Sequence, residues 1–227
     1  MPKTAFYSTI FLLFVLISTR AQTHIATYEL TLIENENYDE YSAMAQEDAY
    51  TNNFYLIFDK NYSLFTSSNL MNGKVRMSDG YARTISEIIF DNNEKIFYFE
   101  SFITEIQEKL CVKRKEIVNW QITDEKKNIN NLECYRAIGI FESGKSKIRI
   151  DAWFAPSIPY AYGPSYFNGL PGLVVMATEG DEYFLSLSEI NFNAELHKDS
   201  KTIPEKICTE NVITYQEYTK ILSEINN

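Results

Sequence analysis

Short runs of aromatic and β-branched residues follow one another from Ala26 to Asn193, and turns rich in Asn, Asp, Gly and Lys separate them. This texture is typical of antiparallel strands joined by hairpins, since those turn residues tolerate tight or left-handed backbone. Helical periodicity is mostly absent from this part of the chain. We expect strands at Ala26–Ile33, Phe54–Phe58, Tyr62–Thr66, Thr84–Phe90, Lys95–Ile103, Leu110–Lys115, Val118–Thr123, Glu133–Phe141, Lys147–Phe154, Leu173–Thr178 and Tyr183–Phe192.

Alternation of apolar and polar positions is clearest in the stretch 147–154, where every even-numbered residue is apolar. Successive side chains of a strand point to opposite faces, so we expect the apolar face in the core. The other face carries Lys147, Arg149, Asp151 and Trp153. We interpret this second face either as a solvated sheet surface or as the lining of a groove.

The C-terminal residues show helical spacing instead. Thr214 and Glu217 form the Thr-x-x-Glu pattern of a capping box. Apolar residues follow at the intervals of one helix face, namely Tyr218, Ile221, Leu222 and Ile225. We expect a short amphipathic helix that docks on the sheet. The whole pattern predicts an all-β fold, a single curved antiparallel meander sheet or half-barrel with a short C-terminal amphipathic helix.

The first residues have the pattern of a secretory signal peptide. Lys3 precedes an apolar stretch, and small residues stand at the positions that a signal peptidase requires before Gln22. The apolar stretch is shorter than the ~20 residues of a membrane-spanning helix. We therefore expect residues 1–21 to be removed by cleavage between Ala21 and Gln22. The mature chain, 22–227, is expected to be one soluble domain without a transmembrane segment, exported to the periplasm or secreted.

Charge narrows the classes of function. The 227 residues include 31 Asp and Glu against 21 Lys and Arg, which is a formal net charge of −10. This acidic balance, with no basic run, rules out a nucleic-acid-binding protein and disfavours binding to anionic membrane surfaces. The 16 Tyr and 15 Phe suit strands, in which aromatic residues are favoured.

Three cysteines, Cys111, Cys134 and Cys208, lie in the expected mature chain. In an exported protein we expect one disulfide between two of them, unless all three are buried thiols. Their wide spacing, without histidines nearby, argues against a zinc site. No P-loop or dinucleotide-binding motif is present, so we expect neither a metal nor a cofactor.

Proline and glycine, with 6 and 8 residues in the chain, are concentrated between residues 156 and 172. Proline fixes φ and glycine permits positive φ, so covalent sterics prescribe the path of this loop. Loops in compact domains usually have about 4 to 6 residues, and a longer ordered loop is more often functional. We therefore predict an ordered, functional loop at 156–172.

This loop carries a resemblance to a known family. Gly163-Pro164 and the run Phe-Asn-Gly-Leu-Pro-Gly-Leu-Val at 167–174 resemble the signature of the GLPGLI family of exported bacterial proteins. The stretch Glu133–Ala137 is similar to a segment that precedes this signature, and Val174 replaces its final Ile. The resemblance implies export into a Bacteroidota-type envelope, and it implies no particular activity.

Candidate catalytic residues are few. The histidines are His24, close to the expected new N-terminus, and His197. Ser165 lacks the following glycine that a nucleophile elbow requires. Asp151, two residues before Trp153, is the best candidate for a glycosidase-type carboxylate, although a solvated acid on a strand is the simpler explanation. We therefore expect a non-enzymatic protein, with a hydrolase as the less favoured alternative.

We expect a non-catalytic envelope module that binds or carries an apolar ligand or a peptide, because a curved sheet rich in Phe and Tyr can present an apolar concave face. The alternative is a protein–protein interaction module that presents loop 156–172 to another envelope protein. The simplest interpretation is that the aromatic residues only fill the core. The candidate ligand- or partner-binding residues are Trp153, Tyr160, Tyr162, Gly163, Pro164, Phe167, Gly169, Leu170, Pro171 and Gly172.

Overall fold

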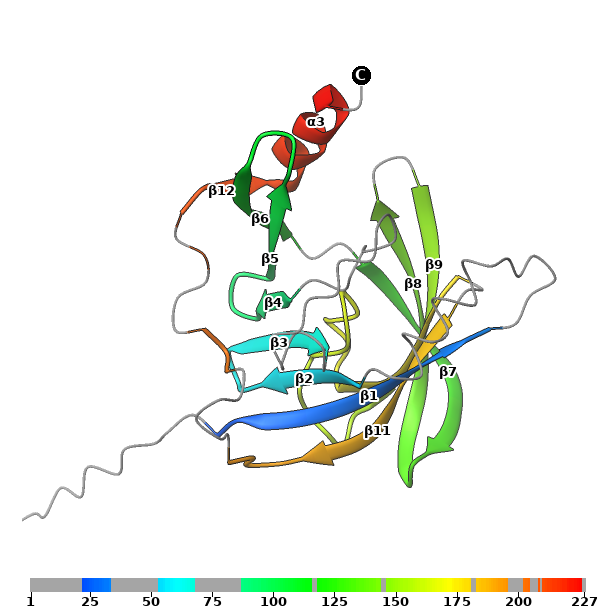
Figure 1. The fold of residues 1–227 in the computed structure, drawn as a ribbon. Coiled ribbons are helices and arrows are strands. Elements are labelled where there is room, and N and C mark those ends of the chain that lie inside the picture. The colour runs from blue at the N-terminus through cyan, green and yellow to red at the C-terminus, as the bar shows by residue number, and fades with distance from the viewer. Residues whose placement is uncertain are drawn as a thin grey trace, which may run out of the picture.

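The structure is a computed structural model, and it describes residues 22–33, 53–67, 87–115, 118–143, 146–180, 183–195, 202–204, 208 and 210–225. The expected signal peptide lies outside these ranges. The described residues form a 12-stranded sheet followed by one helix, α3 (Tyr215–Ile225) (Figure 1). The strands are β1 (His24–Leu32), β2 (Phe54–Phe58), β3 (Tyr62–Ser67), β4 (Ile88–Asp91), β5 (Ile96–Ile103), β6 (Glu108–Lys115), β7 (Val118–Ile129), β8 (Leu132–Ser143), β9 (Ser146–Ala155), β10 (Leu173–Glu179), β11 (Tyr183–Asn191) and β12 (Val212–Thr214).

Two meanders make up the sheet, and β1 joins them. The strand order is β12-β6-β5-β4-β3-β2-β1-β11-β10-β9-β8-β7. Strands β1 to β6 pair antiparallel in sequence order, as do β7 to β11, and β1 also pairs antiparallel with β11. The predicted all-β antiparallel fold with a short C-terminal helix is thus confirmed, although the described strands include one parallel pair, β12 with β6.

The differences from the predicted strands have local causes. β7 runs on to Ile129 instead of ending at Thr123, and its pairing with β8 is irregular between Ile122 and Lys126. This irregularity interrupts the alternation from which the strand is recognised. The sequence pattern does not predict β12, because a strand of three residues is too short to show a period.

The sheet is strongly curved (Figure 1). β6 and β7 lie near opposite ends of the strand order, yet only residues 116 and 117 separate Lys115 from Val118. Such a link spans at most about 11 Å between the two Cα atoms. The two meanders therefore meet at this corner, and the sheet encloses an interior without closing into a barrel.

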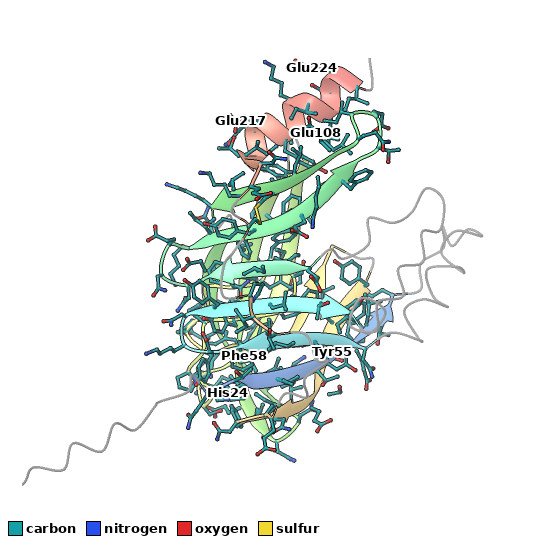
Figure 2. The ribbon with its side chains drawn as sticks, turned by 60° about the vertical axis from the view of Figure 1, so that its left-hand side comes forward. His24, Tyr55, Phe58, Glu108, Glu217 and Glu224 are labelled. Atoms are coloured by element: carbon teal, nitrogen blue, oxygen red, sulfur yellow. A yellow bond between two sulfur atoms is a disulfide. The ribbon has the colours of Figure 1, made fainter. Side chains whose placement is uncertain are left out.

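Helix α3 caps a smaller apolar cluster, away from the main core. The backbone N–H of Thr214 donates to Glu217 Oε2 at 2.7 Å, and that of Glu217 donates to Thr214 Oγ1 at 3.3 Å, which confirms the capping box. The apolar side of the helix packs on Ile103, Leu110 and Val112 of the β5–β6 hairpin. Figure 2 shows this helix at the far end of the row of strands that begins at His24 and Phe58.

Among the residues that the structure describes, no helix has the length and apolar character that crossing a membrane requires.

Candidate functional site

Loop 156–172, which we call the interior loop, connects β9 to β10 and folds back on itself. The backbone N–H of Gly169 donates to the carbonyl of Ala161 at 3.0 Å. The N–H of Val174, at the start of β10, donates to the carbonyl of Tyr162 at 2.9 Å. These bonds occupy backbone groups that would otherwise be buried and unpaired. The interior loop is therefore an ordered part of the fold, as its composition predicts.

The tyrosines of the interior loop fill the space that the curved sheet encloses. The Tyr162 ring lies 5.7 Å from that of Phe58 and 6.2 Å from that of Phe90, between centroids. The Tyr166 ring lies 5.3 Å from Phe97 and 5.5 Å from Phe141, again between centroids. These partners come from β2, β4, β5 and β8, so the loop contacts both meanders.

Hydrogen bonds fix the interior loop and the start of β10 in this position. Tyr28 of β1 donates its hydroxyl proton to the carbonyl of Val174 at 2.6 Å. Trp120 of β7 donates from Nε1 to the carbonyl of Asn168 at 2.8 Å. The Asn168 side chain accepts from the backbone N–H of Gly163 at 3.0 Å. Strands from both meanders thus hold the segment through polar groups as well as through packing.

The glycines of the motif are required by close approach of backbone to backbone. A Cβ at Gly163 would lie 2.3 Å from the carbonyl oxygen of Phe167, and one at Gly172 would lie 2.4 Å from that of Ala155. Both distances are far below van der Waals contact. Gly169 has φ 94°, a conformation that side chains other than glycine rarely adopt. The glycines of the motif are therefore needed for the backbone conformation of the loop.

Most of the predicted site residues are buried. Tyr162, Phe167 and Leu170 are each 1% exposed. Gly163, Pro164 and Gly172 are also buried, Tyr160 and Trp153 are partly buried, and Gly169 and Pro171 are exposed. Apart from the exposed Gly169 and Pro171, the structure brings the residues of the interior loop together in or against the core, and Trp153 packs against this core from β9. Their buried side chains present little surface to a partner and leave the concave face filled.

Trp153 lies on the opposite face of β9, among charged residues. The Lys127 ammonium is 4.2 Å from the centre of the Trp153 ring. Asp151, two residues before Trp153, has one carboxylate oxygen 2.5 Å from Arg136 Nε and the other 3.0 Å from an Arg149 nitrogen. Hydrogen bonds from Arg136, then those from Arg149, lower the pKa of Asp151. A carboxyl held ionised in this way is unsuited to act as a general acid.

His24 is part of the core, contrary to the frayed N-terminal position that its place in the sequence suggests. It is 4% exposed. The backbone N–H of Asn193 donates to His24 Nδ1 at 3.1 Å, so Nδ1 carries no proton and Nε2 donates to the Tyr160 hydroxyl at 2.7 Å. Burial lowers the pKa of His24, against the opposing effect of Asp59. Both ring nitrogens are thus occupied, so the His24 imidazole is not free to act as a catalytic base.

The described residues contain no other arrangement for nucleophilic or metal chemistry. Ser165, with φ 54°, has no described histidine available as a base, since His24 is bonded to Tyr160 and Asn193. His197 lies outside the described residues. No group of three or more His, Cys, Asp or Glu in the described chain is placed to hold a metal ion.

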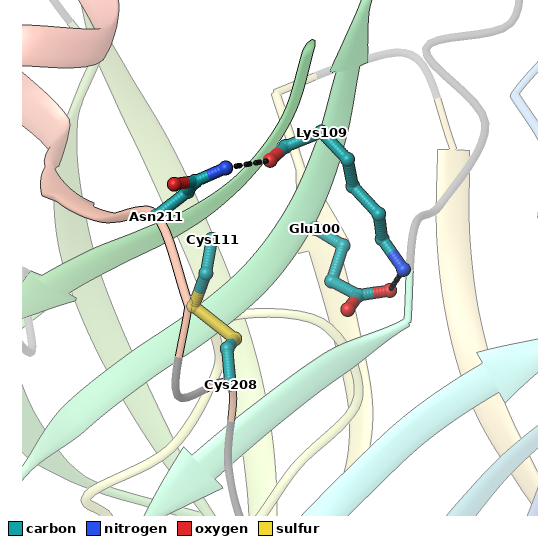
Figure 3. Close-up of a disulfide and its surroundings, with 5 residues drawn as sticks. All are labelled: Glu100, Lys109, Cys111, Cys208 and Asn211. Carbon is teal, nitrogen blue, oxygen red and sulfur yellow. Dashed lines mark hydrogen bonds and ion pairs between the residues drawn. A yellow bond between two sulfur atoms is a disulfide. The ribbon is translucent and has the colours of Figure 1, made fainter.

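Two of the three cysteines form a disulfide, and the third is a free thiol. Cys111 of β6 and Cys208 form a disulfide that joins residues 97 positions apart in the chain. Cys134 is buried and free, and burial raises the pKa of its thiol. A buried thiol with a raised pKa is a weak nucleophile. The disulfide has a structural role, because it attaches the chain before β12 to β6 of the sheet (Figure 3).

An open hollow of about 580 Å³ adjoins this disulfide on the outer face of the β5–β6 hairpin. We call it the hairpin groove. One wall is formed by the hairpin together with Glu87 and Ile89 at the start of β4. The other is formed by the tethered segment, which comprises Pro204, Cys208, Glu210 and Asn211. Asn211 accepts from the N–H of Cys111 through its carbonyl at 3.1 Å and donates from Nδ2 to the Lys109 carbonyl at 3.3 Å. This groove cannot be predicted from local sequence patterns, because its walls come from segments that are distant along the chain.

Comparisons with known proteins show a similar fold, and over a short stretch a similarity to a family of unknown function. No curated protein matches the sequence. The structure is similar to PNGF-II in crystals of space groups C2 and P21, each with a TM-score of 0.59, at 13% and 15% sequence identity. These matches cover 90% of this chain and 33% and 34% of the other, so the chain spans about a third of the length of PNGF-II. An uncharacterized conserved protein from Thermus thermophilus is less similar, with a TM-score of 0.37, 8% identity, and coverage of 86% of this chain and 91% of that one.

The sequence match falls on the interior loop and the strands that flank it. Residues 141–176 match the model of a family described as Protein of unknown function (Porph_ging). This range includes the end of β8, all of β9, the interior loop and the start of β10. The region in which this chain is similar to the Porph_ging family is therefore the part that fills and braces its interior.

Proposed function

We propose that this chain is an exported, non-catalytic binding module of the GLPGLI kind, and that it binds a peptide segment of an envelope protein on its outer face. The observation that carries the proposal is the contrast between two spaces. The interior is filled by Tyr162, Phe167 and Leu170, each 1% exposed. The hairpin groove is open, and its volume of about 580 Å³ lies in the range of ligand-binding sites.

This contrast favours a peptide over an acyl chain as ligand. A carrier of the half-barrel type needs an empty apolar interior, whereas here the interior loop occupies it. The lining of the hairpin groove combines apolar residues such as Ile89 with polar ones such as Asn211 and Glu100. Mixed linings of this kind suit a peptide, which has both backbone polar groups and side chains.

Two observations support export. The N-terminal residues have the signal-peptide pattern, and the Cys111–Cys208 disulfide is a type of bond that persists in oxidising compartments. The run that resembles the GLPGLI signature, 163–174, lies within residues 141–176, which match the Porph_ging family model, and the export that the GLPGLI resemblance implies supports the proposal. Intact-mass measurement of the protein from a periplasmic extract tests this point, and a mass that retains residues 1–21 would contradict it.

The binding function is tested by selecting a random heptapeptide library on the immobilised mature chain and mapping the complex by hydrogen exchange. We expect protection of β5, β6 and the tethered segment. Protection confined to the interior loop would favour the alternative interaction module instead. If no peptide is retained better than by heat-unfolded protein, the binding function is wrong.

Native mass spectrometry of the same preparation addresses the remaining alternatives. We expect the mass of the polypeptide without a bound lipid, because the buried side chains of the interior loop fill the described part of the interior. A stoichiometric acyl ligand would contradict the proposal. Turnover of ester, glycoside or peptide substrates would contradict its non-catalytic part.

A further inference from the structure

We propose that the hairpin groove binds an arginine-containing extended segment, an inference that rests on the peptide-binding function above. The charges of the lining point to a cation. Glu87, Glu100, Glu108 and Glu210 line the groove with one base, Lys109. This imbalance attracts a cationic ligand and disfavours an acidic one.

Lys109 and Glu100 form an ion pair that a ligand can displace. Lys109 Nζ is 2.7 Å from Glu100 Oε2, and the two side chains are 63% and 56% exposed (Figure 3). Pairs as exposed as this one contribute little to stability. A cationic group of a ligand therefore takes the place of the Lys109 ammonium at Glu100 without unfolding the hairpin.

Tyr98 favours arginine over lysine as that group. It lines the groove and lies two residues before Glu100 on the same face of β5. A planar guanidinium can stack on such a ring while it donates two hydrogen bonds to a carboxylate, which an ammonium cannot do. Burial raises the pKa of Tyr98, and the nearby carboxylates of Asp91 and Glu94 raise it further, so negative charge lies close to this ring as well as at Glu100.

The next residue on this face supplies an apolar contact. Phe102 is 55% exposed and follows Glu100 by two positions. Same-face side chains of an extended chain repeat every ~6.8 Å, in the sheet and in a bound peptide alike. A ligand with arginine at one position and an aromatic residue two positions on can therefore place the first at Glu100 and the second at Phe102.

The tethered segment makes the groove a preformed site. The Cys111–Cys208 disulfide and the two hydrogen bonds of Asn211 hold it against β6. Because Glu100 is the cross-strand partner of Cys111, its carboxylate lies on the face that the tethered segment covers. Helix α3 packs on the opposite face of the hairpin, through Phe99 and Ile103, so it leaves the groove open.

The test is a ¹⁵N NMR titration of the mature chain with the blocked peptide Ser-Arg-Ser-Phe-Ser. We expect shifts in β5, β6 and the tethered segment, and a Kd at least about tenfold higher for the double variant Glu100→Gln, Glu210→Gln. The peptides Ser-Glu-Ser-Phe-Ser and Ser-Lys-Ser-Phe-Ser are expected to bind more weakly. Glu189→Gln, an exposed carboxylate on β11, is the matched control and should leave the Kd unchanged.

Lys109→Gln distinguishes a displaced ion pair from a structural one. Removing the competing ammonium should tighten binding about two- to fivefold. Weaker binding by this variant, with an unchanged melting temperature, would show that Lys109 is not displaced and would overturn that step.

Three other results would overturn the proposal. They are no shift in the groove at millimolar peptide, equal binding of the Arg and Glu peptides, and an unchanged Kd in the double variant. Spermine binding with the affinity of the peptide would identify a general cation site instead. If library selection yields groove-binding peptides without arginine, the inference about arginine is wrong while the peptide-binding function stands.

Discussion

Gly163 illustrates how single residues hold the interior loop in place. Its missing side chain lets the Phe167 carbonyl approach, and its N–H donates to the Asn168 side chain. Asn168, in turn, accepts from Trp120 through its backbone carbonyl. Trp120 lies over Gly139, where an added Cβ would come within 2.8 Å of its ring. Gly139 of β8 and Gly163 of the interior loop thus leave room for the contacts of Trp120 and Asn168, which connect β7 with the loop.

Gly163→Ala is expected to destabilise the protein by about 3 kcal/mol, because the new methyl group meets backbone that cannot move aside. Urea unfolding of the purified chain measures this loss. Tyr162→Phe is the matched control, since the Tyr162 hydroxyl is buried without a hydrogen-bond partner among the described residues. Removing such a group is neutral or stabilising. Equal stability of Gly163→Ala and the native chain would contradict the close approach seen here.

His24 should make stability depend on pH. The unfolded chain takes up a proton near the ordinary histidine pKa of about 6.5. The folded chain does so only at lower pH, because burial lowers the pKa of His24. Between the two values the unfolded state binds more protons, so the free energy of unfolding falls as the pH drops below about 6.5.

Urea titrations at pH 7.5 and pH 5.0 measure this dependence, and His24→Gln is the comparison. The variant should be less stable than the native chain at pH 7.5, and it should lose less stability on acidification. If both proteins lose the same amount, carboxylates account for the whole effect and the assignment to His24 is wrong.

The β5–β6 hairpin shows how one element serves two purposes. Its inner face carries Ile103, Leu110 and Val112 under α3, while its outer face carries Cys111 and the walls of the hairpin groove. Alternation along the strands separates these two faces. β12 and the disulfide attach the C-terminal part of the chain to β6. The hairpin therefore depends on contacts made after residue 202.

Reduction of the disulfide, or the double variant Cys111→Ser, Cys208→Ser, is expected to lower stability by about 2 to 5 kcal/mol. The bond joins residues 97 positions apart and so constrains the unfolded chain, and its release removes that constraint. Hydrogen exchange should accelerate more in β12 and α3 than in the interior loop. Uniform acceleration across the chain would show that the C-terminal elements do not depend on this bond in particular.

At the scale of the whole molecule, β1 is the strand on which both meanders depend. It pairs with β2 on one side and with β11 on the other, and its Tyr28 is fully buried against β10. β1 is the first of the described strands and β11 is near the end of the chain, so this pairing closes a contact across most of the sequence. Such long-range pairing costs loop-closure entropy, and the packing of the interior offsets this cost only once both meanders are in place.

Deletion of residues 22–33 is therefore expected to abolish cooperative unfolding, as followed by near-UV circular dichroism in urea. Deletion of residues 215–227 is the control, because α3 covers only the smaller apolar cluster. We expect the control to keep a cooperative transition at lower stability. A cooperative transition in the chain without β1 would contradict the joining role of this strand.

Much of the fold follows from local sequence. The strands from β1 to β11 and the cap of α3 are predictable because alternation, turn residues and the Thr214–Glu217 pattern act within a few positions. The interior loop is predictable as an ordered segment for the same reason, since proline and glycine restrict the backbone locally. The buried state of Tyr162 and His24 is not predictable in this way, because it depends on strands far away in the chain.

The strands β1 to β11, the helix and the stiffness of the loop at 156–172 are properties of neighbouring residues and can be predicted from the sequence. The three-dimensional structure was needed to show that this loop turns inward, that Cys111 pairs with Cys208, and that the open groove lies outside the β5–β6 hairpin. Burial and pairing depend on the register and the curvature of the sheet. These arise when β1 joins β11 and the two-residue link between β6 and β7 brings the meanders together.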